Sequence, residues 1–303
     1  MKSRLLVPLL ATTAVAAFAL TGCSSSSPGA GAASGGAIRV VASTDVYGDI
    51  ASQIGGKAVS VTSILTNPNQ DPHGFEADAQ TQLAISKAQL VVENGGGYDD
   101  YVDTMRSSVK SKAPLVNAVD VSGFKAVDGD LNEHVFYDYP TMTKVANAIA
   151  AQLAKIDPAE SSTFFSHAAT FKTAMGKLEA QTAALKTTYA GQKVTYTEPV
   201  PGYLFDSIGL VNATPAAFSE AVEAGNDVPP AALNDMLKLL ASKEVKLLAF
   251  NEQASSPEAT EAQKAAEKAG LAVVPVTETL PKGEDYEAWQ QRNVDAIKAA
   301  LSK

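Results

Sequence analysis

The chain has 303 residues, with 24 Lys or Arg and 33 Asp or Glu, and a formal net charge of −9 at pH 7. It contains one cysteine, so it forms no intramolecular disulfide. An acidic chain without basic runs is a poor ligand for nucleic acid or for an anionic membrane surface. These features exclude nucleic-acid binding as the expected function and are compatible with a cationic ligand.

The first 22 residues have the organisation of a secretory signal. Lys2 and Arg4 form a basic start, and an apolar stretch follows from Leu5 to Leu20. This stretch is too short, and too soon followed by polar sequence, for a membrane span. Leu20-Thr21-Gly22-Cys23 resembles the bacterial lipobox, in which the cysteine is lipidated and becomes the new N-terminus. We therefore expect a membrane anchor at Cys23, and an ordinary secreted protein with an unused thiol is the alternative.

Residues 23–36, rich in Ser, Gly and Ala, are expected to form a flexible tether. Loss of the signal removes two basic residues and no acidic residue, which leaves a net charge of −11. The remaining chain exceeds one typical domain. We expect an N-terminal lobe at 37–157, a linking helix at 158–189 and a C-terminal lobe at 190–303.

Short β-branched runs alternate with amphipathic stretches, which is typical of βα units on a parallel sheet. The first half has expected strands at 38–42, 59–65, 90–92 and 114–116, and expected helices at 45–54, 77–88 and 141–156. From Pro158 to Tyr189 only Gly176 interrupts a helical pattern, which predicts a rod of about 45 Å. The second half has expected strands at 194–197, 245–250 and 272–276, and expected helices at 231–242, 258–270 and 286–301. The predicted fold class is α/β, with two Rossmann-like lobes.

One of the three histidines lies in the hexapeptide Asp71-Pro72-His73-Gly74-Phe75-Glu76. Pro72 fixes its own φ and pushes Asp71 toward an extended conformation, so a rigid loop is expected here. Gly74 permits a tight turn directly after the histidine. A neutral imidazole held in this way is a good ligand for a divalent transition metal. A surface turn without a ligand is the alternative for this peptide.

Four potential metal ligands follow predicted strands or precede a predicted helix, two in each half of the chain: His73, His134, Glu198 and Glu278. Ligands of open α/β sheets bind beyond the carboxyl ends of the strands, where these loops meet. The separations of 61, 64 and 80 residues exclude a local metal clip. The pattern predicts a metal site between the two lobes.

Each candidate has an alternative explanation. His134 could be a hydrogen-bonded histidine beside Glu133 and Asp138, and Glu198 and Glu278 could be solvated loop carboxylates. Glu252 also ends a strand and is the substitute ligand if one of the four fails. His167, in the long helix, is expected at the surface. The Asn94-Gly95-Gly96-Gly97 run lacks the lysine and Ser/Thr of a phosphate-binding loop.

These motifs resemble the metal-specific solute-binding lipoproteins of bacterial ABC importers (ZnuA/TroA-like), which serve manganese, zinc and iron uptake. The resemblance extends from Ile38 to the C-terminus. The hexapeptide is similar to the first-ligand motif of that family. Glu133-His134-Val135-Phe136 with Asp138 is similar to the second, although the family usually has Asp-Pro where this chain has Asn132-Glu133.

Two further positions match the family with substitutions. Glu198 falls where zinc members usually place a histidine and many manganese members a glutamate, and Glu278 falls where an aspartate is usual. The resemblance implies a rigid backbone helix between the lobes. It also implies a metal site in the cleft, and an ABC permease in the membrane as the partner.

Four protein ligands would close the coordination shell, whereas catalytic zinc keeps an open position, so capture and release are favoured over hydrolysis. Two imidazoles and two carboxylates form a harder set than three imidazoles and one carboxylate, which favours Mn²⁺ or Fe²⁺. The Irving–Williams order still predicts tight Zn²⁺ binding in vitro. We expect a monomer that transports Mn²⁺ or Zn²⁺, with manganese preferred.

Two other classes remain open. A secreted zinc-dependent hydrolase would need an open metal site and a general base, and the chain contains no His-Glu-x-x-His motif. A surface lipoprotein adhesin with a structural metal is the other, and nothing in the residues requires it.

Overall fold

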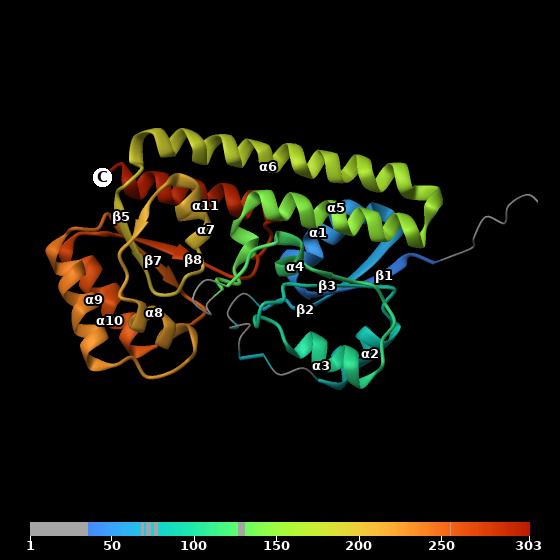
Figure 1. Ribbon diagram of the computed structural model, residues 1–303, viewed down its shortest axis with the longest axis horizontal. Helices are drawn as coiled ribbons and strands as arrows, with labels where there is room; N and C mark the ends of the chain where they lie inside the picture. Colours follow the sequence, from blue (N-terminus) through green and yellow to red (C-terminus); the bar gives the residue numbers. More distant parts are fainter. Residues whose placement is uncertain (1–35, 68–69, 71–73, 76–77, 127–130, 255) are drawn as a thin grey trace, which may run out of the picture. The chain divides into compact units, whose positions relative to one another are not determined.

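The computed structural model describes residues 36–67, 70, 74–75, 78–126, 131–254 and 256–303 (Figure 1). Residues 37–303 form one compact unit. His73 lies outside the described residues, and so do the predicted signal and the lipidation site at Cys23. Across the described parts of the chain, no helix combines the length and the apolar character that a membrane span requires.

The first half of the unit is built on a parallel sheet of four strands in the order β2-β1-β3-β4. All but one residue of β1 are buried, as expected for a parallel sheet covered on both faces. The strands are β1 (Ile38–Thr44), β2 (Val59–Leu65), β3 (Leu90–Glu93) and β4 (Leu115–Asn117). The helices are α1 (Asp45–Gly55), α2 (Ala79–Lys87), α3 (Tyr101–Ser108), α4 (Ala118–Ser122) and α5 (Tyr139–Ile156).

A single long helix, α6 (Ser161–Tyr189), follows a 3₁₀ turn at Pro158–Glu160. Its buried residues recur at intervals of three or four, so one stripe faces the rest of the unit. α6 packs against α1 and α5 of the first half and against α7 and α11 of the second (Figure 1). Its 29 residues correspond to a rod of about 44 Å. The prediction of a long linking helix is confirmed, and Gly176 does not interrupt it.

The second half has its own parallel sheet in the order β6-β5-β7-β8. The strands are β5 (Lys193–Tyr196), β6 (Val211–Asn212), β7 (Leu247–Asn251) and β8 (Ala272–Val276). The helices are α7 (Gly202–Ile208), α8 (Ala216–Glu223), α9 (Pro230–Ser242), α10 (Pro257–Ala269) and α11 (Tyr286–Leu301). The α/β class with two parallel sheets is confirmed, whereas α3, α4, α7, α8 and β6 had no counterpart among the predicted elements.

One buried apolar cluster contains residues from both halves and from α6. Its aromatic part joins Phe136 and Tyr137 to Tyr286 and Trp289, with ring centroids 5.4 to 6.2 Å apart. Because these rings come from both halves, the two sheets share a core and do not depend on α6 alone for their connection.

The loop between β8 and α11 is fastened to the first half by hydrogen bonds. The hydroxyl of Tyr137 donates to the carbonyl of Thr277 at 2.8 Å. Asp45 and Asp49, on α1, accept the backbone N–H groups of Leu280 and Tyr286, each at 3.0 Å. This loop belongs to the second sheet by sequence, and hydrogen bonds to the first half also hold it in place.

Candidate metal centre

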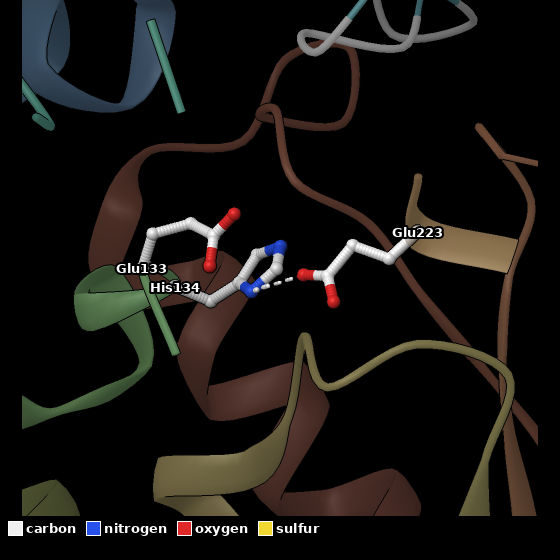
Figure 2. Close-up of side chains that lie close together, drawn as sticks. All are labelled: Glu133, His134 and Glu223. Carbon is white, nitrogen blue, oxygen red and sulfur yellow. Dashed lines mark ion pairs between the residues drawn. The ribbon is translucent and has the colours of Figure 1, made fainter. Parts of the chain in front are cut away.

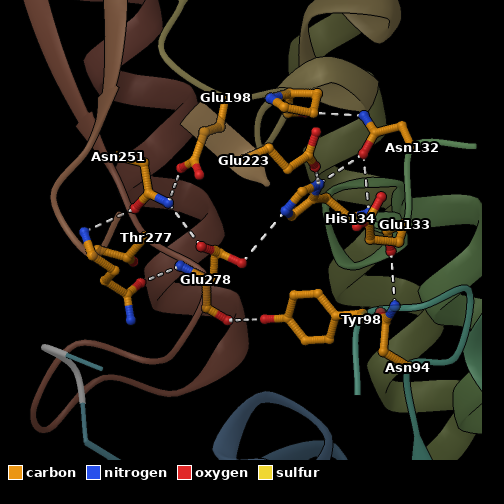
Figure 3. A network of polar contacts seen from close by, with 12 residues as sticks. Asn94, Tyr98, Asn132, Glu133, His134, Glu198, Glu223, Asn251, Thr277 and Glu278 are labelled. Atoms are coloured by element: carbon orange, nitrogen blue, oxygen red, sulfur yellow. Dashed lines mark hydrogen bonds and ion pairs between the residues drawn. The ribbon is translucent and has the colours of Figure 1, made fainter. Parts of the chain in front are cut away.

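His134 lies directly before the 3₁₀ turn Val135–Tyr137 and is fully buried. Asn132 fixes its ring. The Asn132 Oδ1 atom accepts the backbone N–H of His134 at 3.0 Å and lies 2.8 Å from Nδ1. When the neutral ring carries its proton on Nδ1, Nε2 has a free lone pair and is the atom that can bind a metal. The imidazole therefore presents Nε2 toward the second half of the unit (Figure 3).

Glu198 and Glu278 each lie two residues past the end of a strand, β5 and β8 respectively. Strand β7 lies between these two strands and ends at Asn251. The Asn251 Nδ2 atom donates to Glu198 Oε2 and, at 2.7 Å, to Glu278 Oε1 (Figure 3). The sheet order thus brings both carboxylates to the same place, with one amide between them.

The spacing of the donors suits one shared ion. His134 Nε2 lies 3.4 Å from Glu278 Oε2. Two donors that are each about 2.1 Å from a tetrahedral ion are about 3.4 Å apart. Glu198 is 2% exposed, and its Oε1 has no hydrogen-bond partner among the described residues. A buried carboxylate oxygen without a partner is costly, and a bound cation would remove that cost.

The electrostatics of this cluster are dominated by buried carboxylates. Burial by itself lowers the pKa of His134. The hydrogen bond with Glu278 and the charges of Glu278, Glu133 and Glu223 outweigh that effect and raise the pKa to about 9. Burial, and then the charge of Glu278, raise the pKa of Glu198 above its usual value. Without an ion, the site therefore holds protons at neutral pH.

A second group of donors lies on the Nδ1 side of His134. One donor atom from each of Glu133, His134 and Glu223 falls within 4.8 Å of the others (Figure 2). The Glu223 Oε1 atom is 3.8 Å from Nδ1, and both glutamates are half-buried. A cavity of about 310 Å³ lies beside them and is lined also by Asn132. Because Asn132 holds the Nδ1 proton, we regard the Nε2 side as the ligand face.

The structure brings together three of the four predicted ligands, His134, Glu198 and Glu278. The alternative in which the two glutamates are solvated is wrong, because they are 2% and 0% exposed. His73 lies outside the described residues. Gln70, three positions earlier, accepts at its carbonyl a hydrogen bond of 3.1 Å from the Gln253 side chain.

The other residues singled out in the sequence have structural roles. Glu252 is exposed and is no substitute ligand. His167 is half-buried, contrary to the expected surface position, and a ring nitrogen lies 3.0 Å from the carbonyl of Ile54. Asp138 caps α5 by accepting the N–H of Thr141 at 2.9 Å. Asp99 accepts hydrogen bonds from the backbone N–H groups of Asn94 and Gly95, both at 2.7 Å. These N–H groups are therefore already engaged and do not form a phosphate-binding loop.

Sequence reasoning missed three residues of this centre. Asn251 had no signal, because the predicted strand ended at residue 250. Glu223 ends α8, a helix that was not predicted. Asn132 was noticed only as a departure from the family pattern, and its contact with the ring of His134 is visible only in the structure.

Comparison with known proteins identifies relatives of this chain. The family described as zinc-uptake complex component A, periplasmic (ZnuA) matches residues 40–300. The chain is 30% identical over 170 residues to the manganese-binding lipoprotein MntA of Bacillus subtilis (strain 168), which covers 54% of each chain. It is 24% identical over 227 residues to the manganese-binding lipoprotein MntA of Halalkalibacterium halodurans, covering 69% of this chain and 74% of the relative. The first match thus spans about half of that relative's length.

Solved structures share the fold. The periplasmic zinc-binding protein TroA from Treponema pallidum superposes with a TM-score of 0.76 at 17% identity, covering 88% of this chain and 100% of that one. FpvC from Pseudomonas aeruginosa, solved in complex with Mn²⁺, superposes with a TM-score of 0.73 at 22% identity, covering 88% and 98%. The family match takes in both sheets and the long helix, and it confirms the resemblance seen in the motifs: the chain belongs to the ZnuA family of periplasmic metal-uptake components.

Proposed function

We propose that this chain is an extracytoplasmic solute-binding protein that captures one divalent transition-metal ion and delivers it to an ABC permease. The observation that carries the proposal is the convergence of His134, Glu198 and Glu278, all buried, from three separate loops. Two buried carboxylates beside one imidazole leave an excess of negative charge that a divalent cation would balance.

The proposed ligands are His73, His134, Glu198 and Glu278. His134 would bind through Nε2, and each glutamate through the oxygen that Asn251 does not engage. Four protein ligands leave no open position for an attacking water, so we propose binding and release and not hydrolysis.

The proposed cargo is Mn²⁺ or Zn²⁺, and Fe²⁺ fits the same donors. Two carboxylates with two imidazoles favour manganese more than a site with three imidazoles would. Two relatives named manganese-binding lipoproteins support this preference. Purified protein is nevertheless expected to bind Zn²⁺ tightly in vitro, because zinc stands above manganese in the Irving–Williams order.

We also propose that the mature protein is a monomer held at the outer face of the cell membrane by lipid on Cys23. The sequence around Cys23 and the lipoprotein names of two relatives support the anchor. An anchored binding protein stays close to its permease, which raises the effective concentration of the ion carrier at the membrane.

The test is metal binding by metal-stripped protein, measured by competition calorimetry with Mn²⁺, Zn²⁺ and Fe²⁺ at pH 7. One ion per chain is expected. His73→Ala, His134→Ala and Glu278→Ala should each weaken binding by more than about 100-fold, the upper end for loss of an outer-shell partner. His167→Ala is the matched control, since its ring bonds to Ile54 on α1, and it should bind as the unmodified protein does. Full affinity in His73→Ala would remove that residue from the ligand set. Full affinity in His134→Ala as well would refute the site.

A further inference from the structure

Asn251 occupies a special position in the proposed site. It is the last residue of β7, the strand between β5 and β8, and it is fully buried. It pairs in register with Val276, two residues before Glu278, and its backbone N–H donates to Thr197 Oγ1 at 3.0 Å, one residue before Glu198. Its backbone is therefore tied to both strands that lead to the proposed ligands.

The orientation of the Asn251 amide follows from its neighbours. Oδ1 accepts the backbone N–H of Gln253 at 3.1 Å. Nδ2 has two hydrogens and two carboxylate partners, Glu198 Oε2 and Glu278 Oε1. The reversed amide would place its oxygen against two carboxylates and its NH₂ group against an N–H donor. The chemistry permits only the orientation that donates one hydrogen bond to each glutamate.

Each glutamate thus has one oxygen engaged by Asn251 and one directed elsewhere. The second oxygen of Glu278 is the one 3.4 Å from His134 Nε2. The second oxygen of Glu198 is buried and accepts no hydrogen bond from any described residue. Bidentate binding by either glutamate would have to rotate the oxygen that Asn251 engages toward the ion, and the hydrogen bond opposes that rotation, since hydrogen bonds to charged groups are among the stronger ones.

We propose that Asn251 is a specificity-determining residue, which restricts both glutamates to one metal–oxygen bond each. The inference rests on the proposed function and adds to it how the ion is selected. With monodentate glutamates, His134, Glu198 and Glu278 offer one donor atom each, a small number that suits four-coordinate transition ions. With bidentate glutamates these two residues alone would offer four oxygens, a set that approaches the six to eight oxygen ligands of Ca²⁺. Asn251 therefore discriminates against ions that need many oxygen ligands.

The test compares Asn251→Leu and Asn251→Ala with the unmodified protein. Leucine has the same number of side-chain heavy atoms as asparagine, branched at the same carbon, and donates no hydrogen bond. Alanine provides a second, smaller variant if the bulkier methyl groups of leucine impair folding. The control is Gln253→Ala. Gln253 is a neighbouring amide that accepts the backbone N–H of Glu278 at 2.6 Å and donates to Thr279 Oγ1 and to the carbonyl of Gln70. None of these bonds involves a carboxylate of Glu198 or Glu278. Affinities for Zn²⁺ and Mn²⁺ are measured by competition, with Ca²⁺ as a further competitor, and X-ray absorption gives the coordination number of the bound ion.

In both Asn251 variants the ratio of Ca²⁺ to Mn²⁺ affinity should rise by at least about tenfold, the effect expected for one hydrogen bond to a charged group. Ca²⁺ should begin to compete, and the coordination number of bound Mn²⁺ should increase. Gln253→Ala should weaken all ions alike and leave the ratio unchanged. A ratio and coordination number equal to those of the unmodified protein in both Asn251 variants would overturn the inference. Absence of ion binding by the unmodified protein would instead refute the proposed function.

Discussion

Binding of Zn²⁺ at pH 7 should release protons from the site. The pKa of about 9 for His134 means that its imidazole is almost fully protonated at pH 7 in the metal-free protein. Glu198, whose pKa is raised by burial, also holds a proton. Since only neutral imidazole and ionised carboxylate bind metal, each ion must displace between one and two protons.

The size of the pH effect on metal affinity follows from the pKa of His134. At two pH units below the pKa of His134, protonation of this residue alone weakens metal binding about 100-fold relative to its limit at high pH. Affinity should therefore rise about tenfold for each pH unit between 6 and 8 through His134, and more steeply where Glu198 also titrates.

Two measurements test the predicted release of protons on metal binding. Calorimetric titration of metal-stripped protein with Zn²⁺, in buffers with different enthalpies of ionisation, gives the number of protons released at one pH. Competition titrations at pH 6, 7 and 8 give the slope of affinity with pH. Fewer than about half a proton per ion, with an affinity that does not change over this range, would show that the imidazole is already neutral and refute the reasoning.

The thermal stability of the metal-free protein should change with pH in the opposite direction and fall as pH rises. Because the folded-state pKa of His134 is raised above 6.5, its contribution to stability is complete below pH 6.5 and is lost as pH rises through about 9. The raised pKa of Glu198 also makes the metal-free protein less stable as pH increases above 4.5. Hence the rise in Tm caused by Zn²⁺ should be larger at pH 8.5 than at pH 6.5.

Two further predictions concern residues around the site. Asn132→Ala removes the acceptor that holds Nδ1 of His134 and also the donor to the carbonyl of Pro199. We expect it to weaken the binding of every divalent ion by about 10- to 100-fold in competition titrations, and unchanged affinity would show that the ring is oriented without it. Cys23→Ser removes the only thiol of the chain and with it the proposed lipid attachment. The variant should move from the membrane fraction to the soluble extracytoplasmic fraction while it retains full Zn²⁺ affinity, whereas continued membrane association would exclude Cys23 as the anchor.

The strand-end loops were predictable because their signals are local. The β-branched runs that became β5 and β8 placed Glu198 directly after one predicted strand and Glu278 two residues after the other, where ligands of such sheets bind. The pattern could not show that two glutamates would be fully buried, since burial depends on how the loops pack against the other half.

Asn251 and Glu223 are residues of the site that local sequence patterns could not identify. Asparagine is depleted in strands, so the predicted strand stopped one residue short of it. Side chains alternate along a strand, and once Asn251 faces the site its neighbour Glu252 must face away, as its exposure shows. Glu223 ends an eight-residue helix that follows a two-residue strand, and elements this short leave too few periods to recognise.

The chain contains a single tryptophan, Trp289, and it is fully buried in the aromatic cluster that joins the two halves. Its indole N–H donates to Thr277 Oγ1 at 3.1 Å, one residue before Glu278. All tryptophan emission from this protein therefore arises beside the loop that provides one of the proposed ligands. The intrinsic fluorescence of Trp289 is therefore sensitive to the surroundings of that loop. It can be measured on unlabelled protein to detect movement of the loop when an ion binds or is released.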